Sequence, residues 1–144
     1  MMISAKKLMA VVVMFSLFAA CTQTEIVHTS TNKTVANKLD TRKWNISSVT
    51  MDGEDIMKLF SGFSLSISAD NNYTAVNVLE PVWKDKGSFT TAGIAPGFQL
   101  IRNEGTVMDA VQSDTKLVLD FWFDRVDSSG NIVRKKGKYH FEFN

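Results

Sequence analysis

The segment LVLDFWFDRV, from Leu117 to Val126, indicates the fold class of this chain because its residues alternate in character. Successive side chains of a β-strand point to opposite faces, so this period of two predicts a strand with one buried face. Leu117, Leu119, Phe121 and Phe123 point one way, whereas Asp120 and Asp124 point the other way with Trp122 between them.

The same period extends outward from this segment over most of residues 42–144. In the first strand Trp44 and Ile46 share one face, and in the second Phe63, Leu65 and Ile67 alternate with serines. Turn signals rich in Asn, Asp and Gly separate the segments. We therefore expect eight strands, which begin near residue 42 and continue over 63–68, 73–79, 87–93, 98–102, 106–112, 117–126 and 132–143.

One segment departs from the period of two. Asp52-Gly53-Glu54-Asp55 precedes Ile56, Leu59 and Phe60, which are spaced as one helical face, and Gly62 follows. Acidic residues in a first turn and a glycine after the last turn are typical of a helix. The pattern predicts a short helix of about two turns after the first strand, which plugs one end of the core.

Eight strands with short turns and no long helices predict consecutive antiparallel pairing. Such a sheet either closes into a barrel or folds into a sandwich, and closure removes exposed edges. We expect an all-β fold, an eight-stranded antiparallel up-and-down barrel. A barrel that spans a membrane needs strands of about 9 to 11 residues, and most of these segments are shorter.

The first residues have the layout of an export signal. Lys6 and Lys7 precede an apolar run from Leu8 to Ala20, which ends at Cys21. This layout predicts a signal peptide over residues 1–20, cleaved before Cys21. Two alternatives are an uncleaved membrane span, which needs about 20 apolar residues, and an ordinary secretory signal in which Cys21 has no role.

Ala19, Ala20 and Cys21 resemble the lipobox of bacterial lipoproteins, with Phe18 where leucine is usual. The resemblance implies that Cys21, the single cysteine of the chain, carries acyl groups such as palmitate. Thr22 in place of Asp implies transfer to the outer membrane. Whether the periplasmic or the surface face holds the protein is left open.

Residues 21–41 are polar and without a period, so we expect a flexible tether before a domain at 42–144. Cleavage removes two of the 16 basic residues and leaves 14 against 15 acidic ones. A nearly neutral chain argues against nucleic-acid binding. The single basic run, Arg134 to Lys136 with Lys138, is interpreted as a solvated hairpin end, and we expect a monomer.

The segment from Lys43 to Val49, which contains Trp44, resembles the first strand of small lipocalin-like domains of bacterial lipoproteins. Arg42-Lys43 stands where true lipocalins have Gly-x. The resemblance implies a barrel that takes a small apolar or amphipathic ligand in its interior or at one mouth. The large side chains expected to line such a site are Trp44, Trp83, Trp122, Phe121 and Phe123; alternatively, these aromatics fill the barrel.

Residues that could support catalysis are few. His28 lies in the expected tether and His140 in the last strand, where it is expected to face outward, so no histidine cluster forms. Asp120 and Asp124 lie four residues apart on one strand, about 13 Å, too far for a coupled pair. We expect no catalytic residue, no metal, no cofactor and no enzymatic activity.

Two functions remain open. The domain binds a small ligand, or it is an accessory protein that contacts an envelope protein or glycan through its loops. Val82-Trp83, after Glu80-Pro81, is either a packed corner or an exposed contact.

Overall fold

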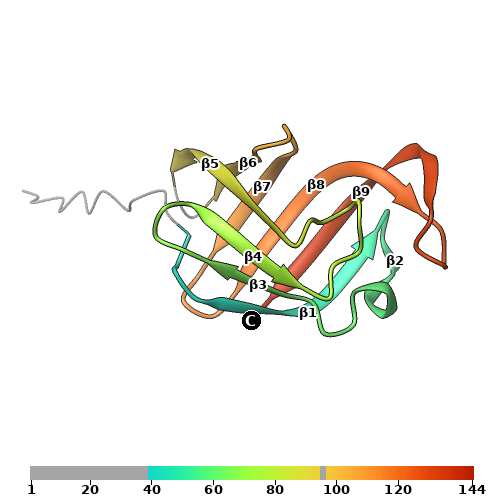
Figure 1. The fold of residues 1–144 in the computed structure, drawn as a ribbon, viewed down its shortest axis with the longest axis horizontal. Coiled ribbons are helices and arrows are strands. Elements are labelled where there is room, and N and C mark those ends of the chain that lie inside the picture. The colour runs from blue at the N-terminus through green and yellow to red at the C-terminus, as the bar shows by residue number, and fades with distance from the viewer. Residues whose placement is uncertain (1–38, 95–96) are drawn as a thin grey trace, which may run out of the picture. The chain divides into compact units, whose positions relative to one another are not determined.

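Eight antiparallel strands close into an up-and-down barrel in the computed structural model, which describes residues 39–94 and 97–144 (Figure 1). Each strand pairs with its neighbours in chain order, and pairing of the first strand with the last closes the sheet. The prediction of an all-β, eight-stranded barrel is confirmed. The barrel strands are β1 (Lys43–Met51), β3 (Ser64–Ile67), β4 (Asn72–Val76), β5 (Lys86–Ile94), β6 (Gly97–Arg102), β7 (Val107–Gln112), β8 (Leu117–Val126) and β9 (Ile132–Phe143), with a short β2 (Glu54–Asp55) beside β1.

Strand β1 closes the barrel by pairing with different neighbours along its length. Its first part lies against β3, where Trp44 pairs with Leu65, and its second part lies against β9, where Val49 pairs with Phe141. A β-bulge between Ile46 and Ser48 interrupts the register within the part that pairs with β9. The bulge shifts the inward phase by one residue, so that Val49, rather than Ser48, continues the buried face.

The prediction of a helix of about two turns after β1 is wrong in the length of the helix. Asp52 and Gly53 both have positive φ, 53° and 84°, and they connect β1 to β2 as a tight hairpin. An Asp-Gly pair favours this two-residue turn because both central residues must adopt positive φ. Between β2 and β3, only Met57–Phe60 is helical, as a single 3-10 turn without an acidic residue in it. Phe60 is fully buried, so the turn does cover the core.

Strand β8 has the predicted bounds, Leu117–Val126, and three of its predicted inner residues, Leu117, Leu119 and Phe121, are buried. Leu117 and Leu119 are fully buried and Phe121 is 2 % exposed, whereas Phe123 is only partly buried. In β9, Tyr139, Phe141 and Phe143 are fully buried. The Phe121 and Tyr139 rings stack 5.3 Å apart at an angle of 9°.

The packed domain begins earlier than residue 42. Leu39 is 1 % exposed and belongs to the core, and the backbone N–H of Asp40 donates to Gln112 Oε1 across 3.1 Å. Leu39 and Asp40 thus belong to the packed domain, which the sequence did not indicate because an isolated leucine in a polar segment gives no periodic signal. The rest of the expected tether, residues 21–38, lies outside the described residues.

Candidate functional site

The three tryptophans expected near a ligand are not brought together. Trp44 is fully buried and Trp83 is 1 % exposed in the core, whereas Trp122 is 62 % exposed on the outer wall. Trp122 faces away from the interior because its neighbour Phe121 takes the inward position on β8. An interior site lined by all three indoles is therefore wrong, and Trp122 belongs to a different surface.

Trp83 acts as an internal plug. The loop between β4 and β5 turns inward at Val82 and Trp83, both of which are buried. The Trp83 ring packs edge-on against Phe63, 5.5 Å between ring centroids at 72°, and against Phe121 at 6.0 Å. Val82-Trp83 is thus a packed corner and not an exposed contact.

Side chains fill the middle of the barrel. Aromatic rings from strands and loops contact one another there, as Phe141 does with Phe60 and with Trp83 at 4.9 and 5.7 Å. The internal space beside Trp83 has a volume of about 10 Å³, which is room for about one water molecule. The residues around that space are Leu39, Leu65, Tyr73, Trp83, Phe89, Leu100, Arg102, Met108 and Leu119.

One cation is buried in this core. Arg102, 2 % exposed, follows Phe98 and Leu100 on the inward face of β6. Its Nη1 donates to the carbonyl oxygen of Val82 at 3.0 Å, and its Nε pairs with Glu104. Burial lowers the pKa of Arg102 below its ordinary value, which the neighbouring Glu104 carboxylate partly offsets. Arg102 therefore fixes the β4–β5 loop, which carries Val82 and Trp83, to β6.

A groove of about 550 Å³ lies at the end of the barrel that carries the β8–β9 turn. This volume lies within the range of small-molecule sites. Apolar side chains form part of its lining and charged or polar ones form the rest. The apolar lining residues are Met51, Ile56, Leu59, Val126 and Val133; the polar ones are Glu54, Asp55, Lys58, Arg125, Asp127 and Ser128.

Turn geometry fixes the polar residues around this groove. Arg125 forms an ion pair with Asp52 of the β1–β2 turn. Asp127 Oδ1 accepts from the backbone N–H groups of Ser129 and Asn131 at 2.8 and 3.0 Å. These hydrogen bonds, that of Asn131 first, lower the pKa of Asp127. Each of the two turns near the groove thus carries an aspartate, and Arg125 of β8 pairs with the first of them.

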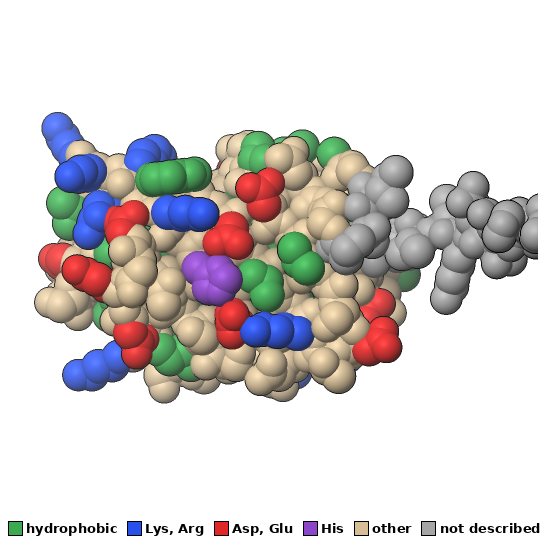
Figure 2. Space-filling view, turned by 180° about the vertical axis from the view of Figure 1, so that it is seen from behind, with side chains coloured by type: hydrophobic (Ala, Val, Ile, Leu, Met, Phe, Trp, Pro, Cys, Tyr) green, Lys and Arg blue, Asp and Glu red, His purple; other side chains and the backbone are tan. Residues whose placement is uncertain are grey.

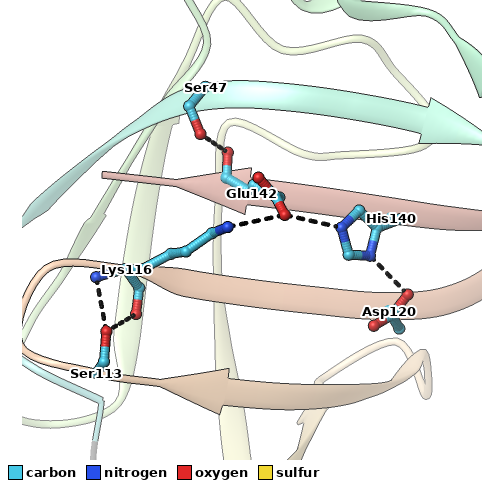
Figure 3. Close-up of polar contacts among 6 residues, drawn as sticks. All are labelled: Ser47, Ser113, Lys116, Asp120, His140 and Glu142. Atoms are coloured by element: carbon cyan, nitrogen blue, oxygen red, sulfur yellow. Dashed lines mark hydrogen bonds and ion pairs between the residues drawn. The ribbon is translucent and has the colours of Figure 1, made fainter.

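A polar network covers the outer wall on β8 and β9 (Figure 3). His140 Nδ1 lies 2.9 Å from Asp120 Oδ1, and its Nε2 lies 3.3 Å from Glu142 Oε1. Lys116 Nζ lies 2.9 Å from the same oxygen of Glu142. As predicted, His140 faces outward; in Figure 2 the purple histidine has acidic side chains on both sides.

The environment of His140 favours its charged form. Partial burial opposes protonation, but the hydrogen bonds to Asp120 and Glu142 outweigh it and raise the pKa of His140. The hydrogen bond from Lys116, followed by that from His140, lowers the pKa of Glu142. Both ring nitrogens are engaged by carboxylates, so the imidazole activates no nucleophile in this arrangement.

The groove and the buried cation were both missed from the sequence. Arg102 could have been found, because it continues the inward phase of Phe98 and Leu100. The groove residues Met51, Leu59 and Val133 come from separate elements and share no local pattern.

Cys21 and His28 lie outside the described residues. Within residues 39–94 and 97–144, no three His, Cys, Asp or Glu side chains are placed to hold a metal ion. In the same part of the chain, no helix has the length and apolar character needed to cross a membrane. Comparison with protein-family models, curated proteins and solved structures gives no significant match, so the resemblance to lipocalin-like lipoproteins stays a prediction.

Proposed function

We propose that this protein is a non-catalytic lipoprotein, anchored to the outer membrane through Cys21, whose barrel holds a small amphipathic molecule in the end groove. The observation that carries the proposal is the contrast between two spaces. The described space beside Trp83 inside the barrel has a volume of about 10 Å³, whereas the groove has about 550 Å³ with apolar and charged lining side by side.

The chemistry of the groove suits a ligand with two parts. An apolar tail would lie on Met51, Leu59 and Val133, where each Å² removed from water contributes roughly 25 cal/mol. A polar head would meet Lys58, Glu54 or Asp55 beside them. The filled barrel supports the segment of β2 with the following 3-10 turn and the β8–β9 turn, which together line most of the groove.

The position of the groove fits a lipid anchor. Asp40 enters the barrel beside Gln112 at the β7–β8 end, and β8 runs from that end to the β8–β9 turn at the groove. The chain before Leu39 is thus joined to the barrel at the end opposite the groove.

Fluorescence titration with 1-N-phenylnaphthylamine, an apolar probe, tests the proposal. The protein is residues 21–144 with Cys21→Ser. Val133, 45 % exposed in the groove, is changed to Asp, and the matched control is Val76→Asp, 54 % exposed on β4. We expect Val133→Asp to weaken binding at least about tenfold, or about 1.4 kcal/mol, and the control to bind as the parent does.

Two results would overturn the groove as the binding site. One is the absence of probe binding in the parent chain. The other is equal affinity in the parent and Val133→Asp, with both shown to be folded by circular dichroism. Displacement of the probe by dodecanoate or dodecylamine then identifies the charge that the polar residues prefer.

A further inference from the structure

The outer wall of β8 carries an exposed aromatic side chain that the groove does not use. Trp122 is 62 % exposed, although tryptophan is usually highly buried. Its backbone partner on β9 is Lys138, and Asp124, the next outward residue of β8, pairs with Lys136. The indole is therefore a flat apolar surface bordered by charged side chains.

A depression of about 460 Å³ adjoins the indole. Trp122, Val107 and Phe123 contribute apolar lining, and Lys136 Nζ lies 5.4 Å from the centroid of the Phe123 ring. Thr106 also lines it and keeps a hydroxyl hydrogen to donate, because its Oγ1 accepts from Arg102 Nη2 at 3.1 Å. The hydroxyl of Thr106, the carboxylate of Glu104 and the ammonium group of Lys136 thus line the depression together with the aromatic side chains.

Positive charge is concentrated on β9, whose Lys136 lines this depression. Arg134, Lys135, Lys136 and Lys138 are four of the 14 basic residues that remain after the predicted cleavage, so the rest of that chain is net acidic. All four are exposed, and Figure 2 shows Lys and Arg side chains gathered toward one end of this face. Within the described residues, only Lys136 among them forms an ion pair, with Asp124 at 2.9 Å.

We propose that this wall binds an acidic polysaccharide of the envelope, with one sugar ring stacked on Trp122. The C–H face of a sugar ring packs on an indole, its hydroxyls exchange hydrogen bonds with Thr106 and Glu104, and its carboxylate or phosphate meets Lys136 and Lys138. The proposal rests on the outer wall and is independent of the groove.

A membrane surface fits the same wall less well. Trp122 lies within a strand, between the outward carboxylates of Asp120 and Asp124. Contact with an anionic bilayer would press both carboxylates against lipid phosphates and desolvate them. A single sugar ring covers the indole and leaves those carboxylates in water.

Titration with polygalacturonate, an acidic polysaccharide, tests this inference on residues 21–144 with Cys21→Ser. We expect salt-dependent binding that quenches tryptophan fluorescence, and weaker binding of neutral dextran. By calorimetry, Trp122→Ala should lower the affinity at least about tenfold, whereas Trp122→Phe, which keeps a ring, should retain most of it. Lys136→Gln with Lys138→Gln should weaken binding more than the control Lys84→Gln with Lys86→Gln on the β4–β5 side.

Three outcomes would overturn the inference. Unchanged affinity in Trp122→Ala would show that no sugar ring stacks on the indole. Equal binding of polyglutamate, an anionic chain without sugars, would show that the site recognises negative charge and not a sugar ring. Binding to vesicles of phosphatidylglycerol and phosphatidylcholine, without binding to polygalacturonate, would assign the wall to a membrane.

Discussion

Arg102 Nη1 donates a hydrogen bond to the carbonyl oxygen of Val82 across 3.0 Å, and this bond joins the end of β6 to the loop that places Trp83 in the barrel. The bond is buried, so neither partner is solvated if the other is lost. The buried position of Arg102 and the inward position of the loop that carries Trp83 therefore depend on each other, and the filling of the barrel interior depends on both.

Replacing Arg102 with Met keeps the apolar length of the side chain and removes the donor. We expect a loss of about 1 to 3 kcal/mol in the free energy of unfolding, because the Val82 carbonyl stays buried without a partner. Urea unfolding followed by circular dichroism measures this loss. Arg134→Met, at an exposed position, should change stability by no more than about 0.5 kcal/mol. Equal midpoints for the two variants would show that the loop holds without Arg102.

Phe121 and Phe123 lie two residues apart on the same strand and should differ in their effect on stability. Phe121, 2 % exposed, packs against Trp83, Tyr139 and Phe141, so Phe121→Ala should cost about 3 to 5 kcal/mol. Phe123 is only partly buried, so Phe123→Ala should cost clearly less. Thermal unfolding compares them. A larger loss for Phe123 would mean that the inward face of β8 is assigned wrongly at this end.

Gly87 lies beneath the ring of its cross-strand partner Tyr73. A Cβ at this position would come within 2.7 Å of Tyr73 Oη and 2.8 Å of Cζ. Because Tyr73 is buried, its ring has little room to move, and Gly87→Ala should cost about 1 to 3 kcal/mol. Gly97→Ala is the control, since an added Cβ there meets no atom within 4 Å. Chemical unfolding of both variants measures the difference, and equal stability would show that the Tyr73 ring shifts freely.

His140 should make stability depend on pH. Its pKa is raised in the folded state, so its contribution is fully present below about pH 6.5, the ordinary value, and is lost as pH rises through the folded pKa. The parent chain should therefore lose stability relative to His140→Gln across this window. The facing groups are Asp120 and Glu142, with Lys116 on the far side of Glu142. Melting temperatures measured at several pH values test this, and parallel profiles for parent and variant would contradict it.

Cys21 is predicted to carry the lipid. Cys21→Ser in the full chain should abolish labelling by an alkyne fatty-acid probe and release the protein from the membrane fraction. The reason is that acylation by one or more chains supplies the membrane affinity that the polar remainder lacks. Fractionation followed by in-gel detection measures both effects. Unchanged membrane retention of the variant would favour an uncleaved span or another anchor.

The sequence by itself determined the strands and their order. Alternation in residues 117–126 placed Leu117, Leu119 and Phe121 on one face, and short turns made neighbouring pairing the simplest connection. These are local properties, since a period of two and a turn residue act over a few positions. The Asp52-Gly53 turn was also readable locally, but a helix-like spacing of Ile56, Leu59 and Phe60 competed with it.

Only the tertiary structure decided what the barrel contains and what its surface offers. Whether Trp83 was exposed or packed depended on the inward turn of its loop and on Arg102, which lies 20 residues from Val82 in the chain. The groove joins Met51, Leu59 and Val133, which only closure of β1 against β9 brings to one end. The burial of a side chain and the shape of a groove depend on segments that are far apart in the sequence. The local pattern of a chain therefore predicts its strands but not its binding surfaces.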